Sequence, residues 1–380
     1  MPARSLSALP DTSFCKNTPQ QATLGRLLLE SGEALPSLDV AYHTWGRLNA
    51  QGDNAVLICH ALTGSSDAED WWKPLFGAGQ ALDPERDFIF CSNVLGSCYG
   101  TTGPTSSSPD TGRPWGPTFP RITIRDMVNA QAVLARHLGV KRLRMVIGGS
   151  MGGMQALEWA AIYPELVETV VAIATSGRHS AWCIGLSEAQ RAALRADVSW
   201  RDGHYDPAHP PTAGLAAARM IAMCLYRSHG SFEERFGRSG EAAGLFEVAS
   251  YLRHQGDKLV ERFDANAYVT LTHAMDSHDL GRGRGEYLRV LEGLEQPTLV
   301  VSISSDALYP PEEQLELYAH IPRAELAELV APHGHDAFLI EGEALNQLVV
   351  DFRSRHRVSS NLVSRALHRT KLSPKASPCL

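Results

Sequence analysis

Short apolar runs rich in β-branched side chains recur along the chain, and helical stretches separate them. The runs with the length and composition of buried strands are Asp39–Trp45, Ala55–His60, Phe88–Ser92, Arg144–Gly148, Thr169–Ala174, Thr298–Ile303 and Ala324–Leu329. Between two of them, Arg125–Leu138 repeats apolar residues at helical spacing. Strands that alternate with helices predict the α/β class, a mostly parallel sheet with helices on both faces.

The alternation stops between Ser176 and Gln296, where almost the whole sequence has helical character. The helices expected in this stretch include Glu188–Ala196, Gly214–Tyr226, Phe246–Phe263 and Ala265–Ala274. Because strand patterns resume at Thr298, one α/β core with a helical insertion is simpler than two domains in tandem. We therefore expect a core of residues 20–176 and 297–357, a helical lid of residues 177–296, and a tail of residues 358–380.

Length and composition allow a full hydrophobic core, since the chain has 380 residues of which 44% are hydrophobic. The net charge of −7 does not indicate the basic surface that binds nucleic acid. Only the end differs, because from Arg353 to Leu380 there are seven Lys or Arg and no Asp or Glu. The final stretch, Val358 to Leu380, follows the last expected helix, Glu343–Ser354, and its composition predicts a basic tail that is disordered or loosely packed.

The seven cysteines are scattered, and none has CxxC spacing. The pattern indicates neither a disulfide framework nor a zinc site, and it is typical of a reducing compartment. The first residues lack the apolar run of a signal peptide, and no run is long enough to span a membrane. We expect a cytoplasmic protein that binds no metal, no membrane and no nucleic acid.

The clearest chemical motif is G-x-S-x-G at residues 148–152, with Ser150 at its centre. An apolar strand precedes it and a helical pattern follows, which is the context in which this motif forms a nucleophile elbow. The turn from strand to helix is strained, so bulky side chains beside Ser150 would block it and hide the hydroxyl. A lone match is weak, but in this context it predicts that Ser150 is a nucleophile.

A serine nucleophile needs a base, and the base needs a carboxylate that orients it. In this fold the acid and then the histidine follow the serine along the chain. Asp306 follows the strand Thr298–Ile303 at the carboxyl edge of the sheet, and His335 follows the next strand. Most histidines and loop aspartates are solvated surface groups, so Asp306 could be a turn residue. The strand order favours Asp306 as the acid, but it leaves His333 open as an alternative base.

The oxyanion of acyl transfer needs two backbone N–H donors, one after the nucleophile and one in a loop after an early strand. Met151 supplies the first, and we predict Leu62, just after the strand Ala55–His60, for the second. A single histidine at a strand end is more often structural, so His60 receives no role.

Several segments together resemble the homoserine O-acetyltransferase family of the α/β-hydrolase fold. The resemblance covers residues 20–355, and the segments occur in the family's order. They are YHTWG at 42–46, HALTG at 60–64, NVLGSCYGTTGPTS at 93–106, GGSMGGMQALEW at 148–159, ARMIAMCLYRS at 218–228, HAMDSHDLGRGRG at 273–285, SDALYPPEE at 305–313 and HGHDAFL at 333–339. The tail beyond Arg355 has no counterpart in the family pattern.

The resemblance implies transfer of an acetyl group from acetyl-CoA to the hydroxyl of L-homoserine, which opens one route to methionine. Ser150 would be acylated and then deacylated in a ping-pong sequence, with His335 as base and Asp306 as its partner. Acetyl-CoA is a co-substrate, no permanently bound cofactor is implied, and a homodimer through the lids is expected.

The substrate residues implied by the resemblance are Arg219, Tyr226, Asp336 and Thr63. Arg219 would bind the carboxylate of homoserine, and Asp336 would bind its ammonium. Because Tyr226 lies seven residues after Arg219, two turns along one face of a helix, both side chains can point to one cleft. The alternative for Arg219 is a solvated position on the helix surface.

Other readings stay open. Close relatives use succinyl-CoA or accept serine with the same catalytic residues, and the segment Asn93–Gly103 would line the acyl pocket. A serine esterase or lipase would use water as the acceptor, although a lipase lid is expected to have a broad apolar face. A fold relative without activity is the third reading, and the order Ser150, Asp306, His335 disfavours it.

Overall fold

The computed structural model describes residues 18–240 and 244–356. Within them one eight-stranded sheet has the order β1-β4-β6-β5-β7-β8-β9-β10. Its strands are β1 Gln20–Thr23, β4 Asp39–Trp45, β5 Ala55–Cys59, β6 Phe88–Ser92, β7 Leu143–Gly149, β8 Val170–Ile173, β9 Thr298–Ile303 and β10 Ala324–Leu329. From β6 to β10 neighbouring strands are parallel, whereas β4 is antiparallel to both β6 and β1. A small hairpin, β2 Leu27–Leu28 and β3 Ala34–Leu35, stands apart. The predicted α/β class is confirmed.

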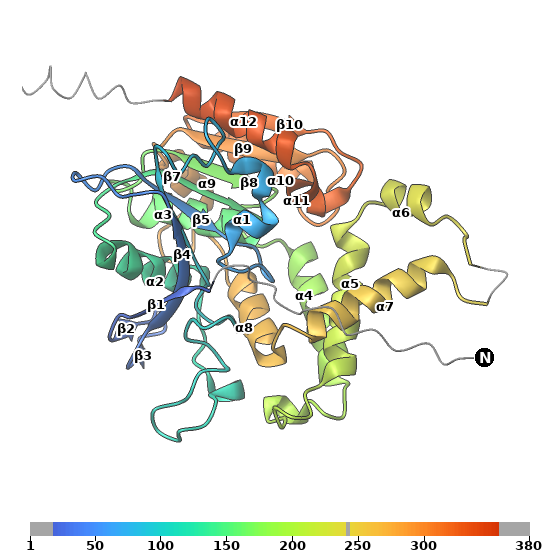
Figure 1. The fold of residues 1–380 in the computed structure, drawn as a ribbon. Coiled ribbons are helices and arrows are strands. Elements are labelled where there is room, and N and C mark those ends of the chain that lie inside the picture. Colours follow the sequence, from blue (N-terminus) through green and yellow to red (C-terminus); the bar gives the residue numbers. More distant parts are fainter. Residues whose placement is uncertain (1–17, 241–243, 357–380) are drawn as a thin grey trace, which may run out of the picture.

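Helices cover both faces of this sheet (Figure 1). Alternate strand residues point to opposite faces, so Leu57 belongs to one buried cluster and Ile58 to the other. The first cluster includes residues of α2 Ile124–His137, α3 Met151–Ile162, α9 Tyr287–Glu292 and α10 Pro311–His320. The second includes residues of α1 Ala68–Trp71, η1 Lys73–Leu75, α11 Ala337–Ile340 and α12 Gly342–Arg355. Burial on both faces explains why the strand sequences are continuously apolar.

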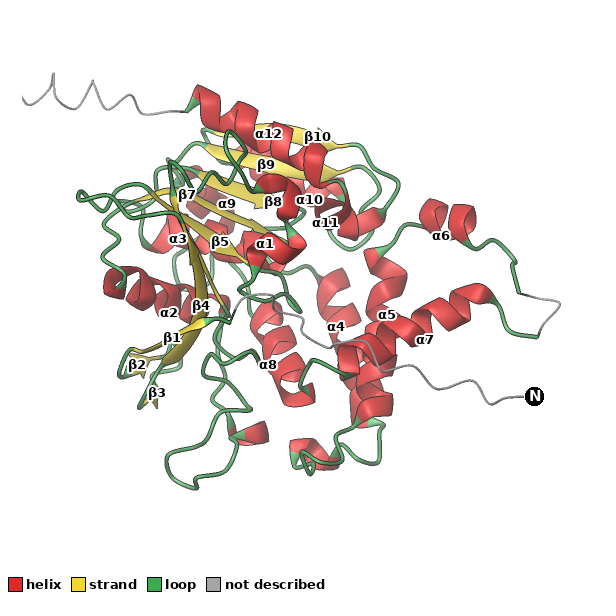
Figure 2. Ribbon diagram, in the orientation of Figure 1, coloured by secondary structure: helices red, strands yellow, loops and turns green. Residues whose placement is uncertain are grey.

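Most of the remaining helices lie between β8 and β9 in the sequence. They are α4 Ala181–Arg195, η3 Arg201–Gly203, α5 Thr212–Tyr226, α6 His229–Arg235, α7 Glu247–Val260 and α8 Ala265–Asp276. Strands β8 and β9 are paired neighbours in the sheet, so the chain leaves the sheet and returns beside the same strand. In Figure 2, α4 and α5 face the ends of the central strands, and α6 and α7 extend away from the sheet. The division into core and lid remains the one that we propose.

Two sequence expectations concern regions of special composition. The tail predicted for residues 358–380 lies outside the described residues. In the described part of the chain, every helix is too short or too polar to cross a membrane.

Candidate active site

Ser150 lies at the sharp turn between β7 and α3, with φ 58° and ψ −125°. Non-glycine residues rarely have a positive φ, and such strain is concentrated at functional sites. The flanking glycines make the turn possible: a Cβ on Gly152 would lie 2.0 Å from the carbonyl oxygen of Cys59, and one on Gly148 would lie 2.4 Å from the Gly152 backbone. The turn therefore packs directly against the end of β5.

Asp306 and His335 are in contact and are almost completely buried. Nδ1 of His335 lies 2.7 Å from Oδ2 of Asp306. The other carboxylate oxygen, Oδ1, accepts the backbone N–H groups of Leu308 and Tyr309 at 2.8 and 3.0 Å. Burial alone would lower the pKa of His335, but the negative charges of Asp306 and Asp336 outweigh it and leave this pKa raised. The Asp306 carboxylate is thus placed to orient the imidazole of His335, and it favours the charged form of that ring.

His333, the alternative base, points elsewhere. Its Nε2 lies 3.3 Å from Oε1 of Glu341, and about a third of its side chain is exposed. The geometry therefore places His335, and not His333, beside Asp306.

The Ser150 hydroxyl makes no hydrogen bond to His335 or to any other described residue. Phe338 nevertheless adjoins both His335 and Gly149, the residue before Ser150: its ring would lie 2.7 Å from a Cβ on Gly149, and its centroid lies 5.5 Å from that of His335. Hydrogen bonds between nucleophile and base are often loose in free enzymes and shorten when substrate binds.

Of the two candidate oxyanion donors, Met151 is the first residue of α3, directly after Ser150, and Leu62 lies in the loop after β5. Among the described residues, the N–H groups of Leu62 and Met151 have no backbone or side-chain acceptor. His60 holds this loop: its Nδ1 contacts the carbonyl of Ala61 at 2.8 Å, and its Nε2 accepts the Val94 N–H at 3.0 Å. Burial lowers the pKa of His60 to about 4, so the ring is neutral and its contacts are structural.

A pocket of about 280 Å³ opens beside the elbow, next to Gly149. Its lining includes Ala61, Thr63, Tyr99, Arg219, Arg262 and Phe338. Of the substrate residues expected from the sequence, Thr63 and Arg219 therefore lie in one pocket with the residue that precedes Ser150.

Tyr226 contacts both the pocket residue Arg219 and the base candidate His335. The guanidinium carbon of Arg219 lies 5.2 Å from the centroid of the Tyr226 ring, and this ring lies 5.7 Å from the imidazole of His335. Asp336 is adjacent, with its Oδ2 3.5 Å from Nε of Arg227. Arg219 thus lines the pocket together with Thr63 and also contacts Tyr226, which packs against His335.

Arg262 is a pocket residue that the sequence did not indicate. It follows α7, and its Nη1 donates to the carbonyl of Thr63 and to the hydroxyl of Tyr99. Nothing in a periodic pattern marks such a residue, because a long side chain reaches the pocket from a loop between helices. Tyr99, in contrast, lies in the segment Asn93–Gly103 that was expected to line an acyl pocket.

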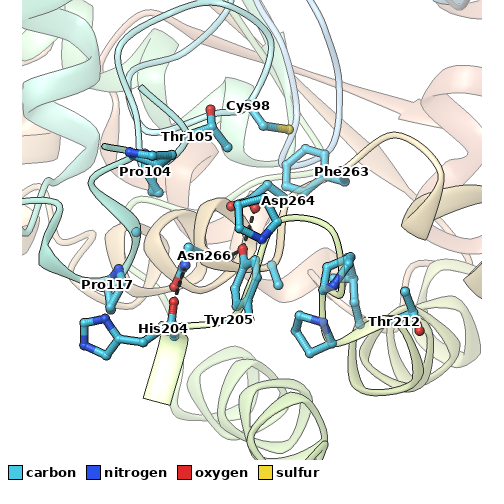
Figure 3. A pocket seen from close by; sticks show the side chains of 18 of the residues that line it. Cys98, Pro104, Thr105, Pro117, His204, Tyr205, Thr212, Phe263, Asp264 and Asn266 are labelled. Carbon is cyan, nitrogen blue, oxygen red and sulfur yellow. Dashed lines mark hydrogen bonds between the residues drawn. The ribbon is translucent and has the colours of Figure 1, made fainter. Parts of the chain in front are cut away.

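A larger hollow of about 780 Å³ lies on the other side of Arg262, which lines both spaces. Figure 3 shows its wall, where Tyr205 points to the carboxylate of Asp264 and Asn266 donates to the carbonyl of Gly203 at 2.9 Å. None of Ser150, Asp306 and His335 lines this hollow. The smaller pocket reaches Gly149, the residue before Ser150, and is therefore the candidate substrate pocket.

Comparison with known proteins places the chain among close relatives. A model of the alpha/beta hydrolase fold family matches residues 54–342. A homoserine O-acetyltransferase of Chloroherpeton thalassium is 63% identical over 329 residues, which are 87% of this chain and 87% of that protein. One from Nostoc punctiforme is 62% identical over 326 residues, 84% of this chain and 92% of the relative.

Solved structures resemble this fold at lower sequence identity. The homoserine O-acetyltransferase from Bacillus anthracis is 26% identical with a TM-score of 0.82, over 88% of this chain and 96% of that chain. Esterase E22 is 27% identical with a TM-score of 0.81, over 88% of this chain and 99% of that chain. The fold is thus shared with acetyltransferases and esterases, whereas the high identity is with acetyltransferases.

Proposed function

The chain belongs to the homoserine O-acetyltransferases, enzymes of the α/β-hydrolase fold, and we propose that Ser150, His335 and Asp306 perform the acetyl transfer. The contact between His335 and Asp306 beside the strained Ser150 elbow is the observation that carries this proposal. The expected product is O-acetyl-L-homoserine, an intermediate on a route to methionine.

In the first half-reaction, the Ser150 hydroxyl attacks the thioester carbonyl of acetyl-CoA while Nε2 of His335 takes its proton. The N–H groups of Leu62 and Met151 bind the oxyanion that forms. The carbon–sulfur bond then breaks, His335 returns the proton to the CoA thiolate, and an acetyl-serine remains.

In the second half-reaction, homoserine enters the emptied site. His335 removes the proton of its γ-hydroxyl, the oxygen attacks the acetyl-serine, and the proton passes to the Ser150 oxygen. Arg219 binds the α-carboxylate, because a planar guanidinium matches two carboxylate oxygens, and Asp336 binds the α-ammonium. Tyr226 and Thr63 complete the wall of this acceptor space.

The acyl donor has a second candidate with one observation in its favour. Arg262 lines the pocket beside the elbow, and a succinyl group would bring a carboxylate that a guanidinium can bind. The names of the relatives favour acetyl-CoA. Specificity constants for the two donors at saturating homoserine decide between them, and a higher kcat/KM for succinyl-CoA would overturn the donor assignment alone.

An esterase activity is the second candidate function, because structures named as esterases share this fold. Release of free CoA thiol from acetyl-CoA, followed with and without homoserine, separates the two. If the enzyme is a transferase, it should release CoA thiol slowly from acetyl-CoA alone. It should release the thiol rapidly and steadily when homoserine is present. Equal release in both mixtures, with water as the acceptor, would overturn the proposed function.

Assembly and location complete the proposal. We infer a homodimer through the lids, supported by exposed apolar side chains such as Trp182 on α4 and Phe246 just before α7. Light scattering on the purified protein tests the dimer. Acetyl-CoA acts as a co-substrate, and the cytoplasmic location expected from the sequence remains a prediction.

A further inference from the structure

Arg227 forms the end of α5 and lies beside Asp336. It is the C-cap residue of that helix, with an extended backbone at φ −108° and ψ 155°. Its Nε is 3.5 Å from Oδ2 of Asp336, and both side chains are mostly buried. That Nε has no hydrogen-bond partner among the described residues, so Asp336 is the group toward which it is directed.

Close backbone packing holds the two residues together. Gly334 has φ +70°, and a Cβ there would lie 2.6 Å from both the Arg227 carbonyl carbon and the Ser228 nitrogen. The Ser228 hydroxyl donates to the carbonyl of Pro332 on the same loop. On its other side, the loop is tied to Ser305, whose hydroxyl accepts the Gly334 N–H at 2.9 Å. The position of Arg227 next to Asp336 is therefore fixed by the fold.

Four charged or titratable groups face Asp336 from the elements around it. Arg219 and Arg227 come from the body and the end of α5, His335 is the preceding residue, and Asp306 follows β9. Burial raises the pKa of Asp336, and the two arginines, Arg219 more than Arg227, oppose this effect. An ammonium binds a carboxylate and not a carboxylic acid, so these arginines favour the form that an amino acid needs.

We propose that Arg227 is a positioning residue for the acceptor, which keeps the Asp336 carboxylate ionised and aimed at the space beside Tyr226 and His335. This inference rests on the proposed function, in which Asp336 binds the ammonium of homoserine. The guanidinium of Arg227 faces Oδ2 of Asp336, and we assign Oδ1 to the incoming ammonium. Arg219 binds the acceptor carboxylate directly, whereas Arg227 acts on the ammonium through Asp336.

The test compares Arg227→Gln and Arg227→Lys with a control, Arg253→Gln, which changes an exposed arginine on α7. Two acceptors are used: homoserine, and 4-hydroxybutyrate, which has the same hydroxyl and carboxylate but no ammonium. Arg227→Gln should lower kcat/KM for homoserine about ten- to a hundredfold, the range for removing one opposite charge beside a buried carboxylate. It should change kcat/KM for 4-hydroxybutyrate and the acetyl-CoA acylation burst by less than about threefold, the spread expected from context alone.

The pH profile is the readout that a purely structural role would not change. The ratio of kcat/KM for homoserine to that for 4-hydroxybutyrate cancels the titration of His335, because both acceptors need the same base. In the wild type this ratio falls at low pH as Asp336 becomes protonated. In Arg227→Gln the fall should begin at a higher pH, and Arg227→Lys, which retains the charge, should lie between the two.

Failure of this inference can be distinguished from failure of the proposed function. If Arg227→Gln and the wild type share one ratio and one pH profile while Arg219→Ala impairs homoserine, the role of Arg227 is wrong and the function stands. If the wild type does not prefer homoserine over 4-hydroxybutyrate, then Asp336 does not bind the ammonium, and that part of the proposed function is wrong. If Arg227→Gln does not fold, Arg227→Met, which also removes the charge, is measured in its place, and a pH profile identical to the wild type would overturn the inference.

Discussion

The ring of Tyr309 lies 5.3 Å from the imidazole of His335, measured between centroids. The same residue donates its backbone N–H to Asp306, the partner of that imidazole. Its hydroxyl contacts Nδ1 of the buried His179 at 3.2 Å. Burial is the main cause that lowers the pKa of His179 to about 3, so this contact involves a neutral ring. Tyr309 therefore packs against the candidate base with its ring and holds the candidate acid with its backbone.

A comparison of Tyr309→Phe with Tyr309→Ala distinguishes the contribution of the ring from that of the hydroxyl. Phenylalanine keeps the ring and loses one buried hydrogen bond, so we expect near-normal kcat and a loss of about 1–3 kcal/mol in the free energy of unfolding. Alanine removes the ring beside His335, so kcat should fall as well. Urea unfolding and steady-state kinetics measure both effects, and a Phe variant as inactive as the Ala variant would contradict this division.

The raised pKa of His335 predicts the pH dependence of acylation. The base must be neutral to accept a proton, so kcat/KM for acetyl-CoA should fall as pH decreases through a midpoint above the ordinary histidine value of 6.5. Asp306→Asn removes the largest contribution that raises this pKa. Its midpoint should therefore move to lower pH, and its plateau should drop by about 10³–10⁴-fold. A pH–rate profile of both proteins tests this, and an unchanged midpoint would exclude Asp306 as the partner of His335.

Two glycine substitutions test the packing at the elbow. Gly152→Ala would place a Cβ 2.0 Å from the Cys59 carbonyl, so the free energy of unfolding should decrease by about 1–3 kcal/mol or more and activity should fall. Gly185→Ala is the matched control, because this exposed position in α4 has no atom within 4 Å of the new Cβ. Alanine should stabilise that helix by about 0.5–1 kcal/mol. Equal effects of the two changes on the denaturant midpoint would contradict the packing argument.

Arg219→Ala tests the assignment of the acceptor carboxylate. The change should lower kcat/KM for homoserine by an amount that corresponds to about 2–5 kcal/mol, the scale of removing one partner from a buried charge pair. Acylation by acetyl-CoA precedes acceptor binding, so the burst of CoA release should change far less. A burst that slows as much as overall transfer would remove Arg219 from the acceptor site.

The sequence could predict the parts of this fold that depend on local patterns. Strand β9 matches the predicted Thr298–Ile303, because its run of branched residues is buried on both faces. Strand β1 was missed because Gln20–Thr23 is polar and buries one residue of four at the edge of the sheet. Helix α4 begins at Ala181, where the Ser180 side chain caps its first turn. The sequence predicted a start at Glu188, because Gly185 interrupts the helical pattern before it.

The candidate site was predictable where the chain order or a motif fixes the position, as for Ser150 and Asp306. The choice between His333 and His335 was not, because it depends on which side chain the left-handed turn at Gly334 directs toward Asp306. Arg262 and Arg227 were not predictable either, since long side chains from the ends of helices reach the pocket through tertiary packing. The catalytic and binding roles themselves remain predictions.

The central claim is that Ser150 carries the acetyl group between donor and acceptor. Mass spectrometry of the protein after mixing with acetyl-CoA alone, followed by peptide mapping, tests it most directly. We predict one acetyl adduct on Ser150 that disappears on addition of homoserine, and no adduct with Ser150→Ala, whose turnover should fall at least about a thousandfold. An adduct on another residue, or a Ser150→Ala protein with near-normal turnover, would contradict the account.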